Sequence, residues 1–449
     1  MNATPIIIIG NGIAGITTAR HIRKKSNKPI LIISKESKYF FSRTALMYVY
    51  MGHLKWEHTQ PYESHFWKKN KLNLLQETVT NIDSENKKIT LSNESILTYD
   101  SLVLATGSIP NKFGWPGENH KGVQGLYSKQ DIENLESLSA SIQESVIVGG
   151  GLIGIELAEM LHSRGKKVTF LVREKSFWNN VLPKQESKII NEHILSHGID
   201  LRLDTSLEEI IADENGRVKL VRTDKGDLIS CQFVGLTAGV KPNIEFVKQT
   251  NIATNRGVLV NKYLETNQPD VYAIGDCAEQ KEPQPGRRSI EAVWYTGRMM
   301  GETLAQTLTG TKTEYNPGNW FNSAKFFDIE YQTYGLVSAH PEDNEKHFHW
   351  KHSAKDLAIT IAYNKETYEF LGINTFGIRM RHEIFDQILY HKRTLFHVAE
   401  HLKDCNFDPE FFNSYEEEII TKFNLEFKTK LKLKRKSWSR IFNSKLMKS

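Results

Sequence analysis

The sequence predicts an α/β protein built from two Rossmann-like domains and a C-terminal α+β domain. A continuous apolar run at Ile6–Ile9 leads into GNGIAG (residues 10–15), and a second at Val146–Val148 leads into GGGLIG (149–154). A helical stretch and another apolar run follow each motif, and this order of strand, glycine turn, helix and strand is typical of a parallel βαβ unit. After about Trp320 the pattern changes to successive alternating strands, which predicts a third domain of mixed type.

The other expected elements follow from the alternation of strands and the longer period of helices. In the Rossmann-like part they are strands at Pro29–Ser34, Tyr99–Leu104, Lys167–Val172 and Val271–Ile274 and a helix at about 153–164. In the third domain they are strands at Glu330–Gly335 and Leu357–Tyr363 and helices within about 381–402.

The predicted domain boundaries follow from the order of these elements. We expect the first Rossmann-like domain at 1–115 and 245–318, and the second at 116–244 between its two halves. The C-terminal α+β domain covers 319–427, and a basic tail covers 428–449.

The composition is that of a multidomain globular protein. Of the 449 residues, 39% are hydrophobic and 25% are charged. No apolar run approaches the ~18 to 20 residues of a membrane-spanning helix, so we expect a cytoplasmic protein. Cys231, Cys277 and Cys405 are far apart in sequence and form no CxxC motif, which argues against a disulfide framework or a dithiol redox centre. Redox chemistry must therefore come from a cofactor.

The first glycine motif has the residues that a dinucleotide pyrophosphate requires. Gly10 permits a tight turn, Gly12 allows the backbone to approach the phosphates, and Gly15 allows the helix to pack closely on the strand. The phosphates then lie at the helix N-terminus. Glu36, beyond the second strand, is the nearest acid that could accept hydrogen bonds from a ribose.

The second motif repeats this geometry with Gly149, Gly151 and Gly154. At the end of its second strand lie Arg173 and Glu174, which point to different nucleotides. Glu174 favours NADH if it binds the ribose hydroxyls, whereas Arg173 favours NADPH if it binds a 2′-phosphate. We prefer NADH slightly, and the choice stays open.

Two such units in one chain imply two bound dinucleotides. The chemical reason for holding two is hydride transfer between a nicotinamide and a flavin, so we expect FAD together with NADH or NADPH.

Five motifs in a fixed order resemble the two-dinucleotide flavoprotein reductases over about the first 320 residues. The subgroup most similar is the ferredoxin, rubredoxin and nitrite reductase type of FAD-dependent pyridine nucleotide oxidoreductase. The motifs are GNGIAG, ATGSIP (105–110), GGGLIGIELAE (149–159), GLTAGVKPN (235–243) and YAIGDCAE (272–279).

The resemblance implies a role for residues in and beyond these motifs. Asp276 would bind the ribityl chain of the flavin, and Glu156 would lie near the nicotinamide and orient it, while the flavin itself performs the chemistry. Trp320 belongs to a segment that resembles the aromatic one closing over the flavin. The further contacts implied are Gly10, Gly12, Ala14, Gly15, Val79, Ala105, Thr106, Gly107, Ala292, Val293 and Trp294 for FAD, with Gly239 as an additional cofactor contact.

The segment FFSRTALMY argues against thiol chemistry. Arg43 matches an arginine of ferredoxin-type reductases, and Tyr48 stands where that pattern has lysine. Among the flavoprotein reductases that the chain resembles, the disulfide reductases carry a cysteine pair in this segment. The peroxide- or oxygen-reducing members carry one cysteine there. The resemblance therefore implies transfer of electrons from the flavin to an external acceptor.

The histidine patterns predict no metal site. His347, His349 and His352 fit a solvent-exposed strand face, because no cysteine or acid stands at ligand spacing. His397 and His401, with Cys405, would share one helix face, and we interpret them as helix surface or core.

The tail from Lys428 to Ser449 holds nine cations and no acid. Two interpretations stay open: an interfacial anchor that would place the protein at the inner face of the membrane, or a disordered, solvated tail. Nucleic acid is not expected as a partner, since no recognition fold accompanies the charge.

Three functional hypotheses follow. The first is an enzyme that reduces a ferredoxin- or rubredoxin-like carrier, the second a peripheral NADH:quinone-type reductase, and the third an NADH-responsive redox-sensing flavoprotein. The sequence identifies neither the acceptor nor the oligomeric state.

Overall fold

The computed structural model describes residues 4–407 and 413–434, and the chain forms two compact units. The first comprises Met1–Lys175 with Gly198–Pro317, and the second comprises Ser176–His197 with Gly318–Ser449. The segment 176–197, which lies within the predicted second Rossmann-like domain, thus groups with the C-terminal residues.

The first parallel sheet of unit 1 is centred on β1 (Ile6–Ile9), which pairs with β2 (Ile30–Ser34) and β7 (Ser101–Leu104). The remaining strands in the order β19-β7-β1-β2-β3 are β19 (Val271–Ala273) and β3 (Leu72–Gln76). All four residues of β1 and of β7 are buried, which explains why both read as continuous apolar runs.

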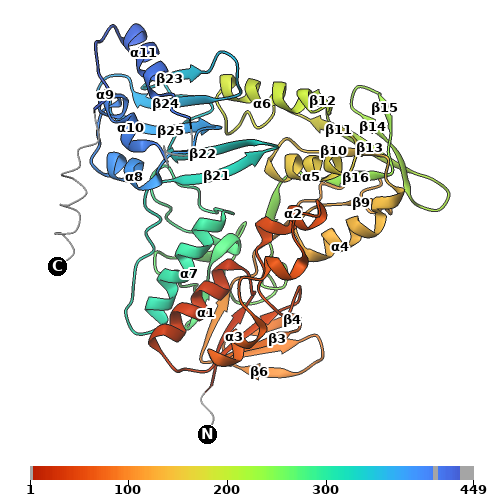
Figure 1. Cartoon of the computed structure of the whole chain (residues 1–449). Coiled ribbons are helices and arrows are strands. Elements are labelled where there is room, and N and C mark those ends of the chain that lie inside the picture. The colour runs from red at the N-terminus through yellow and green to blue at the C-terminus, as the bar shows by residue number, and fades with distance from the viewer. Residues whose placement is uncertain (1–3, 408–412, 435–449) are drawn as a thin grey trace. The chain divides into compact units, whose positions relative to one another are not determined.

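Helix α1 (Ile13–Lys25) follows β1 and packs against α7 (Trp294–Leu308), a segment far along the chain (Figure 1). Gly301 makes this approach possible, because a Cβ there would lie 2.6 Å from the carbonyl oxygen of Ala14. Residues from beyond 290 therefore pack directly against the helix that follows the first glycine motif.

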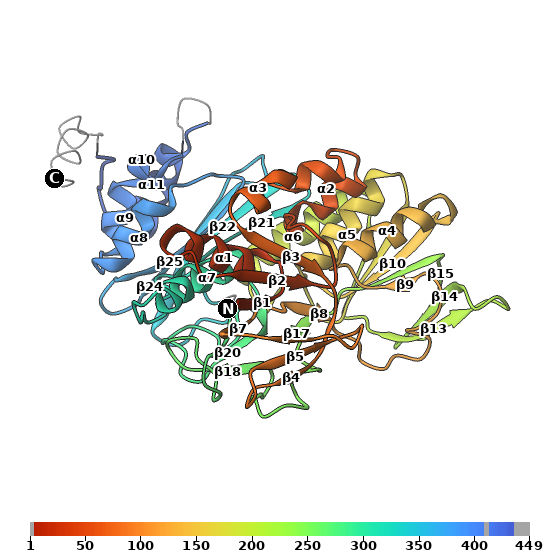
Figure 2. The same ribbon diagram turned by 90° about the horizontal axis from the view of Figure 1, so that it is seen from below.

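The second parallel sheet has the order β12-β11-β10-β16-β9 (Figure 1), and Figure 2 shows its strands β9 and β10 from below. Its strands are β9 (Val123–Gln124), β10 (Glu144–Val148), β11 (Lys167–Val172), β12 (Asp200–Leu203) and β16 (Phe233–Leu236). Helix α5 (Leu152–Ser163) connects β10 to β11. These two parallel sheets with their crossover helices confirm the predicted pair of Rossmann-like regions.

Unit 2 contains a five-stranded antiparallel sheet in the order β21-β22-β25-β24-β23. One face is apolar and packs against α8 (His382–Tyr390), α9 (Leu395–Glu400) and α11 (Glu416–Phe427). The strands are β21 (Phe321–Phe326), β22 (Ile329–Gly335), β23 (Glu345–Lys351), β24 (Ala358–Asn364) and β25 (Phe370–Phe376). The α+β class predicted for this part is confirmed.

The opposite face of this sheet carries polar side chains and meets α6 (Lys184–Ser196). The carboxyl of Glu186 on α6 accepts a hydrogen bond of 2.8 Å from the side-chain amide of Asn374 on β25. Burial raises the pKa of Glu186 to about 8, although hydrogen bonds from Thr360 and Asn374 oppose this shift.

Helices α8 and α9 confirm the helices expected within about 381–402. Two other details of the C-terminal part differ from the sequence prediction. Residue Cys405 lies on α10 (Leu402–Cys405), a separate helix from that of His397, so the expected common helix face is wrong. His347 and His349 are half-buried and alternate with buried Phe348, so the expected exposed strand face is wrong as well.

The beginning of the basic tail packs against unit 2. Leu431 and Leu433 lie against its apolar core, and Lys434 pairs with Glu400 at 2.7 Å. The residues from 435 onward, which make up most of the tail that the predicted anchor requires, lie outside the described part of the chain. Within residues 4–407 and 413–434, none of the helices has the length and apolar character that crossing a membrane requires.

Candidate functional site

The turn between β1 and α1 has a backbone that only glycine tolerates at two of its positions. Gly10 has a φ of 114°, and a Cβ on it would lie 2.0 Å from the carbonyl oxygen of Ala105. A Cβ on Gly15 would lie 2.1 Å from the carbonyl oxygen of Gly10. Gly12 differs, because a Cβ there would meet no atom within 4 Å. The first and third glycines thus serve packing, whereas the second faces open space.

The N-terminus of α1 presents backbone amides to that space. Its N-cap is Gly12, which offers no side-chain hydrogen bond, and the first turn of α1 contains no acid. The first amides of a helix lack intrahelical acceptors and carry a partial positive charge. The turn is therefore suited to an anion such as a pyrophosphate.

Polar groups surround the carboxyl of Asp276, at the end of β19. Ser108 donates a hydrogen bond of 3.0 Å to Oδ2 of Asp276, and the hydroxyl of Tyr127 lies 3.5 Å from the same oxygen. Burial raises the pKa of Asp276, while Ser108, Arg43 and Tyr127 lower it in part. Burial and the nearby Asp276 raise the pKa of Tyr127 to about 12.

The guanidinium of Arg43 joins this group of side chains. It lies over the ring of Tyr127, 4.4 Å from the centroid, and donates to the carbonyl oxygen of Tyr127. It also forms two hydrogen bonds with the carboxylate of Glu36. Burial alone would lower the pKa of Arg43, but Glu36, Tyr127 and Asp276 together outweigh burial and raise it.

The structure brings together Arg43, Asp276, Tyr127 and Ser108, although the last two were not predicted. Tyr127 precedes a capping box in which Ser128 and Asp131 start a helix, and that box was the available sequence signal for a fixed chain at this point. Nothing in the local pattern indicates that Tyr127 reaches Asp276, because 149 residues separate them in sequence.

The other residues predicted to contact FAD are distributed over neighbouring elements of unit 1, with one exception. Thr106 donates to the carbonyl oxygen of Asn243 at 2.8 Å, and Gly107 has a φ of 67°. Val79 starts β4 (Val79–Asp83), Val293 is the N-cap of α7, and Trp294 is its first residue. Trp320 is the exception, because it belongs to unit 2.

The turn between β10 and α5 repeats the first cradle. Gly149 has a φ of 119°, and a Cβ on Gly154 would lie 2.4 Å from the carbonyl oxygen of Gly149. A Cβ on Gly151 would again meet no atom within 4 Å. Gly239, predicted beside a cofactor, has a φ of 87° and accepts a hydrogen bond from the amide of Asn111.

The two side chains that bear on nucleotide choice lie beyond the end of β11. Arg173 and Glu174 form an ion pair of 2.9 Å with each other. The side chain of Arg173 is 79% exposed, whereas that of Glu174 is 33% exposed. The carbonyl oxygen of Glu174 also accepts from the amide of Asp204. The carboxylate of Glu174 is thus the less exposed of the two groups.

Glu156 lies on α5 between residues that are buried. Burial, together with the nearby Glu159, raises the pKa of Glu156 to about 7. A carboxyl with this pKa changes its charge near neutral pH, which is common at functional sites.

The cysteine thiols occupy interior positions. Cys231, Cys277 and Cys405 are all buried. Burial raises the pKa of Cys231 to about 12 and also raises those of Cys277 and Cys405. Their thiols are poor nucleophiles as a result, since the thiolate is the reactive form.

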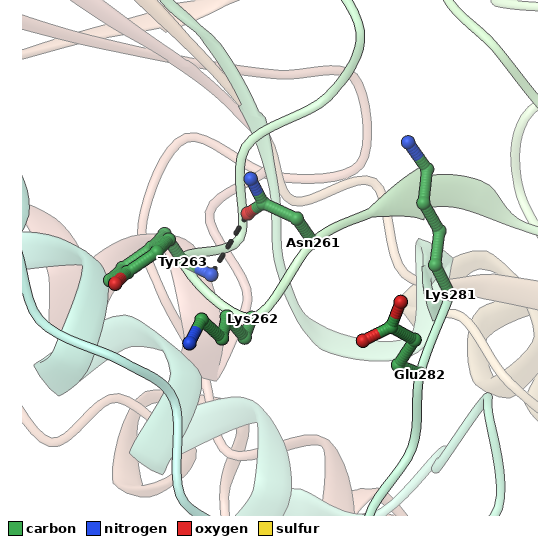
Figure 3. Close-up of a pocket in the computed structure, with 5 residues that line it drawn as sticks. All are labelled: Asn261, Lys262, Tyr263, Lys281 and Glu282. Carbon is green, nitrogen blue, oxygen red and sulfur yellow. Dashed lines mark hydrogen bonds between the residues drawn. The ribbon is translucent and has the colours of Figure 1, made fainter.

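A small pocket elsewhere in unit 1 contains none of the predicted residues (Figure 3). Five polar residues line it, and Oδ1 of Asn261 accepts a hydrogen bond from the backbone amide of Tyr263. The pocket lies at a surface turn and has no glycine cradle, so the two turns at Gly12 and Gly151 remain the candidate cofactor sites. The lining residues are Asn261, Lys262, Tyr263, Lys281 and Glu282.

Comparison with known families shows whether the chain only shares a general nucleotide-binding fold or belongs to a particular enzyme family. Residues 4–301 match the model of the pyridine nucleotide-disulphide oxidoreductase family. The chain belongs to this family. It is an FAD-dependent oxidoreductase that uses NADH or NADPH. The subgroup predicted from the five motifs is confirmed.

Several characterised reductases of this family are similar to the chain. The ferredoxin reductase subunit of 5,5'-dehydrodivanillate O-demethylase from Sphingobium sp. is 30% identical over 75% of this chain and 82% of its own length. The NADH-rubredoxin oxidoreductase of Clostridium acetobutylicum is 29% identical over 70% of this chain and 77% of its own length. The nitrite reductase [NAD(P)H] of Bacillus subtilis is 29% identical over 63% of this chain, which covers 35% of that longer protein.

A solved structure shares the fold of the pyridine nucleotide-disulphide oxidoreductases with this chain. The ferredoxin reductase for the CYP199A2 system from Rhodopseudomonas palustris aligns over 91% of this chain and 96% of its own, with a TM-score of 0.77 and 22% identity.

Proposed function

We propose that this oxidoreductase takes electrons from NADH and passes them through FAD to a small electron-carrier protein of the ferredoxin or rubredoxin kind. The observation that carries the proposal is the combination of two open glycine cradles with Arg43 in the segment where disulfide-reducing relatives are expected to carry cysteine. FAD, when bound, can accept a hydride from a nicotinamide and release electrons singly.

The side chains of the first cradle divide the work of holding FAD. The amides of α1 bind the pyrophosphate, and Gly12 leaves room for it. Asp276 accepts a hydrogen bond from the ribityl chain, and Ser108 and Tyr127 hold its carboxyl in place. Arg43 keeps a positive charge next to this group. A fixed cation near the flavin stabilises negative charge that develops on reduction.

The second cradle binds the nicotinamide nucleotide. The amides of α5 bind its pyrophosphate, Glu174 accepts from the adenosine ribose hydroxyls, and Glu156 orients the nicotinamide. NADH is the favoured nucleotide because Glu174 already pairs with Arg173, and a 2′-phosphate would lie against that carboxylate.

The nature of the acceptor rests on the absence of an accessible thiol among the described residues and on the relatives' printed activities. Because all three thiols are buried, this chain offers no accessible thiol that could relay electrons from FAD to a disulfide. Two relatives are named for a ferredoxin and for rubredoxin, which are one-electron carriers. A membrane quinone is the alternative acceptor, and it depends on the basic tail beyond residue 434.

The acceptor is tested by stopped-flow reoxidation. The protein is reduced with NADH without oxygen and is then mixed with oxidised ferredoxin, rubredoxin or a short-chain quinone. The proposal expects reoxidation by at least one protein carrier at a rate that falls with added salt, as for charge-steered encounters. Fast reoxidation by quinone alone would replace the carrier with a membrane acceptor, and slow reoxidation by all three would favour a redox sensor.

A further inference from the structure

Two histidines of α6 and one aspartate of the adjacent strand connection form a cluster that the flavin chemistry does not use. His193 lies on α6, and His197 follows one turn later as the C-cap of that helix. Asp328 lies in the turn between β21 and β22. All three residues belong to unit 2, and one ligand atom from each lies within 4.8 Å of the other two.

The distances within this cluster are close to those around one small cation. Nε2 of His193 is 2.7 Å from Oδ1 of Asp328, and Nε2 of His197 is 3.7 Å from the same oxygen. Ligands of a tetrahedral zinc ion stand roughly 3.3 Å apart, as follows from Zn–N and Zn–O bonds of about 2.0 to 2.2 Å. The ligand atoms of the three residues lie no more than 4.8 Å from one another, so side-chain shifts of up to about 1.5 Å would place all three atoms on one ion.

Hydrogen bonds orient both rings for metal binding. Nδ1 of His197 lies 2.9 Å from the carbonyl oxygen of His193, and a carbonyl can only accept, so Nδ1 carries the proton and Nε2 the lone pair. Nδ1 of His193 lies 3.2 Å from the carboxylate of Asp356. A carboxylate behind a ligating histidine is the usual support of a zinc site.

The same contacts are unfavourable for a neutral His193 without a cation. Both of its ring nitrogens face carboxylate oxygens, and a neutral ring has only one proton to donate. A lone pair on one ring nitrogen would then face a lone pair on a carboxylate oxygen. Little water can separate the two, because His193 is only 6% exposed. A metal ion at Nε2, or a second proton, removes this repulsion.

We propose that His193, His197 and Asp328 bind one Zn²⁺ ion per chain. Two neutral imidazoles and one carboxylate are a typical zinc donor set, and the exposed side of Asp328 leaves a fourth position for water. The ion fixes the C-terminal end of α6 to the β21–β22 turn, while Glu186 fixes the N-terminal end to the sheet. The site belongs to unit 2 and is independent of the proposed electron acceptor.

Zinc binding to the FAD-loaded, full-length protein tests this site. After treatment with a chelator, the protein is dialysed against ZnCl₂ and its zinc content is measured by plasma mass spectrometry. We expect one zinc per chain in the wild type, loss of that zinc in His197→Gln and Asp328→Asn, and an affinity about 10- to 100-fold lower in Asp356→Asn.

The chain offers a matched control in its other pair of helical histidines four residues apart. His397 and His401 stack at 3.9 Å, but they form no group of three ligands with a neighbouring acid or cysteine among the residues that the structure describes. His397→Gln should therefore retain one zinc per chain. Zinc X-ray absorption of the wild type should show two imidazole rings.

Two results would overturn the proposal. The first is a wild-type protein that binds no zinc at the cluster. The second is equal zinc binding by wild type, His197→Gln and His397→Gln, which would place the metal elsewhere. Flavin content and circular dichroism, equal in all variants, show that a loss of zinc is not a loss of folding.

Discussion

The guanidinium of Arg43 and the carboxylate of Glu36 form a two-bonded ion pair, with N–O distances of 2.9 and 2.6 Å. The side chain of Glu36 is 16% exposed, and Oε1 also accepts from the amide of Lys129. Both carboxylate oxygens are therefore engaged. A role of Glu36 at the FAD ribose stays a prediction, and binding there would require the carboxylate to be shared.

The coupling between Arg43 and Glu36 should be measurable in unfolding. Removing Arg43 leaves a largely buried carboxylate without its cation, so the single variant Arg43→Met should be clearly destabilised. The double variant Arg43→Met with Glu36→Gln should be less destabilised than the sum of the two single variants predicts. We expect a coupling energy of about 0.5 to 3 kcal/mol from urea unfolding. The exposed pair Lys28 and Asp100 serves as control, with at most about 1 kcal/mol. Equal coupling in both pairs would contradict the account.

Gly12 and Gly151 should separate the two cofactors. A Cβ at either position would meet no protein atom within 4 Å, so we expect Gly12→Val and Gly151→Val to fold. Gly12→Val should lose FAD, because the side chain would occupy the space of the pyrophosphate. Gly151→Val should stay yellow and lose reduction by NADH. Flavin absorbance and thermal unfolding check both, and a yellow Gly12→Val protein would show that FAD binds elsewhere.

Glu174 should determine the preference for NADH. Glu174→Ala should raise the KM for NADH about tenfold, the loss of roughly 1.4 kcal/mol, because the ribose hydroxyls lose a charged acceptor. The KM for NADPH should stay level or fall, since the repulsion from the 2′-phosphate is removed. Arg173→Ala is the matched control, and a selective loss of NADPH activity in that variant would instead assign the site to NADPH.

Glu156 should give flavin reduction a pH dependence centred near pH 7. Its pKa is raised to about 7, so the carboxyl is mostly neutral below that pH and ionised above it. An ionised carboxylate beside the nicotinamide stabilises the positive ring that forms as NADH is oxidised. The rate of anaerobic flavin reduction should therefore rise through pH 7 in the wild type and stay flat in Glu156→Gln. The same rise in both proteins would remove Glu156 from this role.

Glu186 should make folding less stable as pH rises. Its folded pKa of about 8 lies above the ordinary value of 4.5, so the folded protein holds a proton that the unfolded chain releases between about pH 4.5 and 8. Stability then falls across that window and levels off above it, by about 1.4 kcal/mol for each unit of raised pKa.

The midpoint of thermal unfolding at pH 6 and pH 9 measures this effect. It should drop in the wild type by more than in Glu186→Gln. Glu192→Gln, on the same helix but half-exposed beside Lys188, should drop as the wild type does. A drop in Glu186→Gln as large as that of the wild type would show that another group causes it.

The sequence predicted what depends on local backbone chemistry. The turns at Gly10 and Gly149 could be predicted, because a positive φ and a backbone carbonyl near the Cβ position exclude any side chain there. The strands at Ile6 and Val146 are recognisable because both of their faces are buried. In these cases the cause lies within a few residues of the pattern.

What the sequence could not provide are contacts between distant segments. Tyr127 reaches Asp276, and Asp328 reaches His193 across 135 residues, without any periodicity that links them. His193 and His197 are four residues apart, a spacing that places both on one face of a helix, but two histidines alone do not predict a third ligand.

The central claim is that one chain binds FAD and a nicotinamide nucleotide so that electrons pass between them. Anaerobic titration of the purified protein with NADH, followed by flavin absorbance, tests it most directly. The account predicts that about one equivalent of NADH per FAD bleaches the flavin, since a hydride carries the two electrons that FAD accepts. A protein that binds FAD but keeps its full flavin absorbance with excess NADH and with excess NADPH would contradict it.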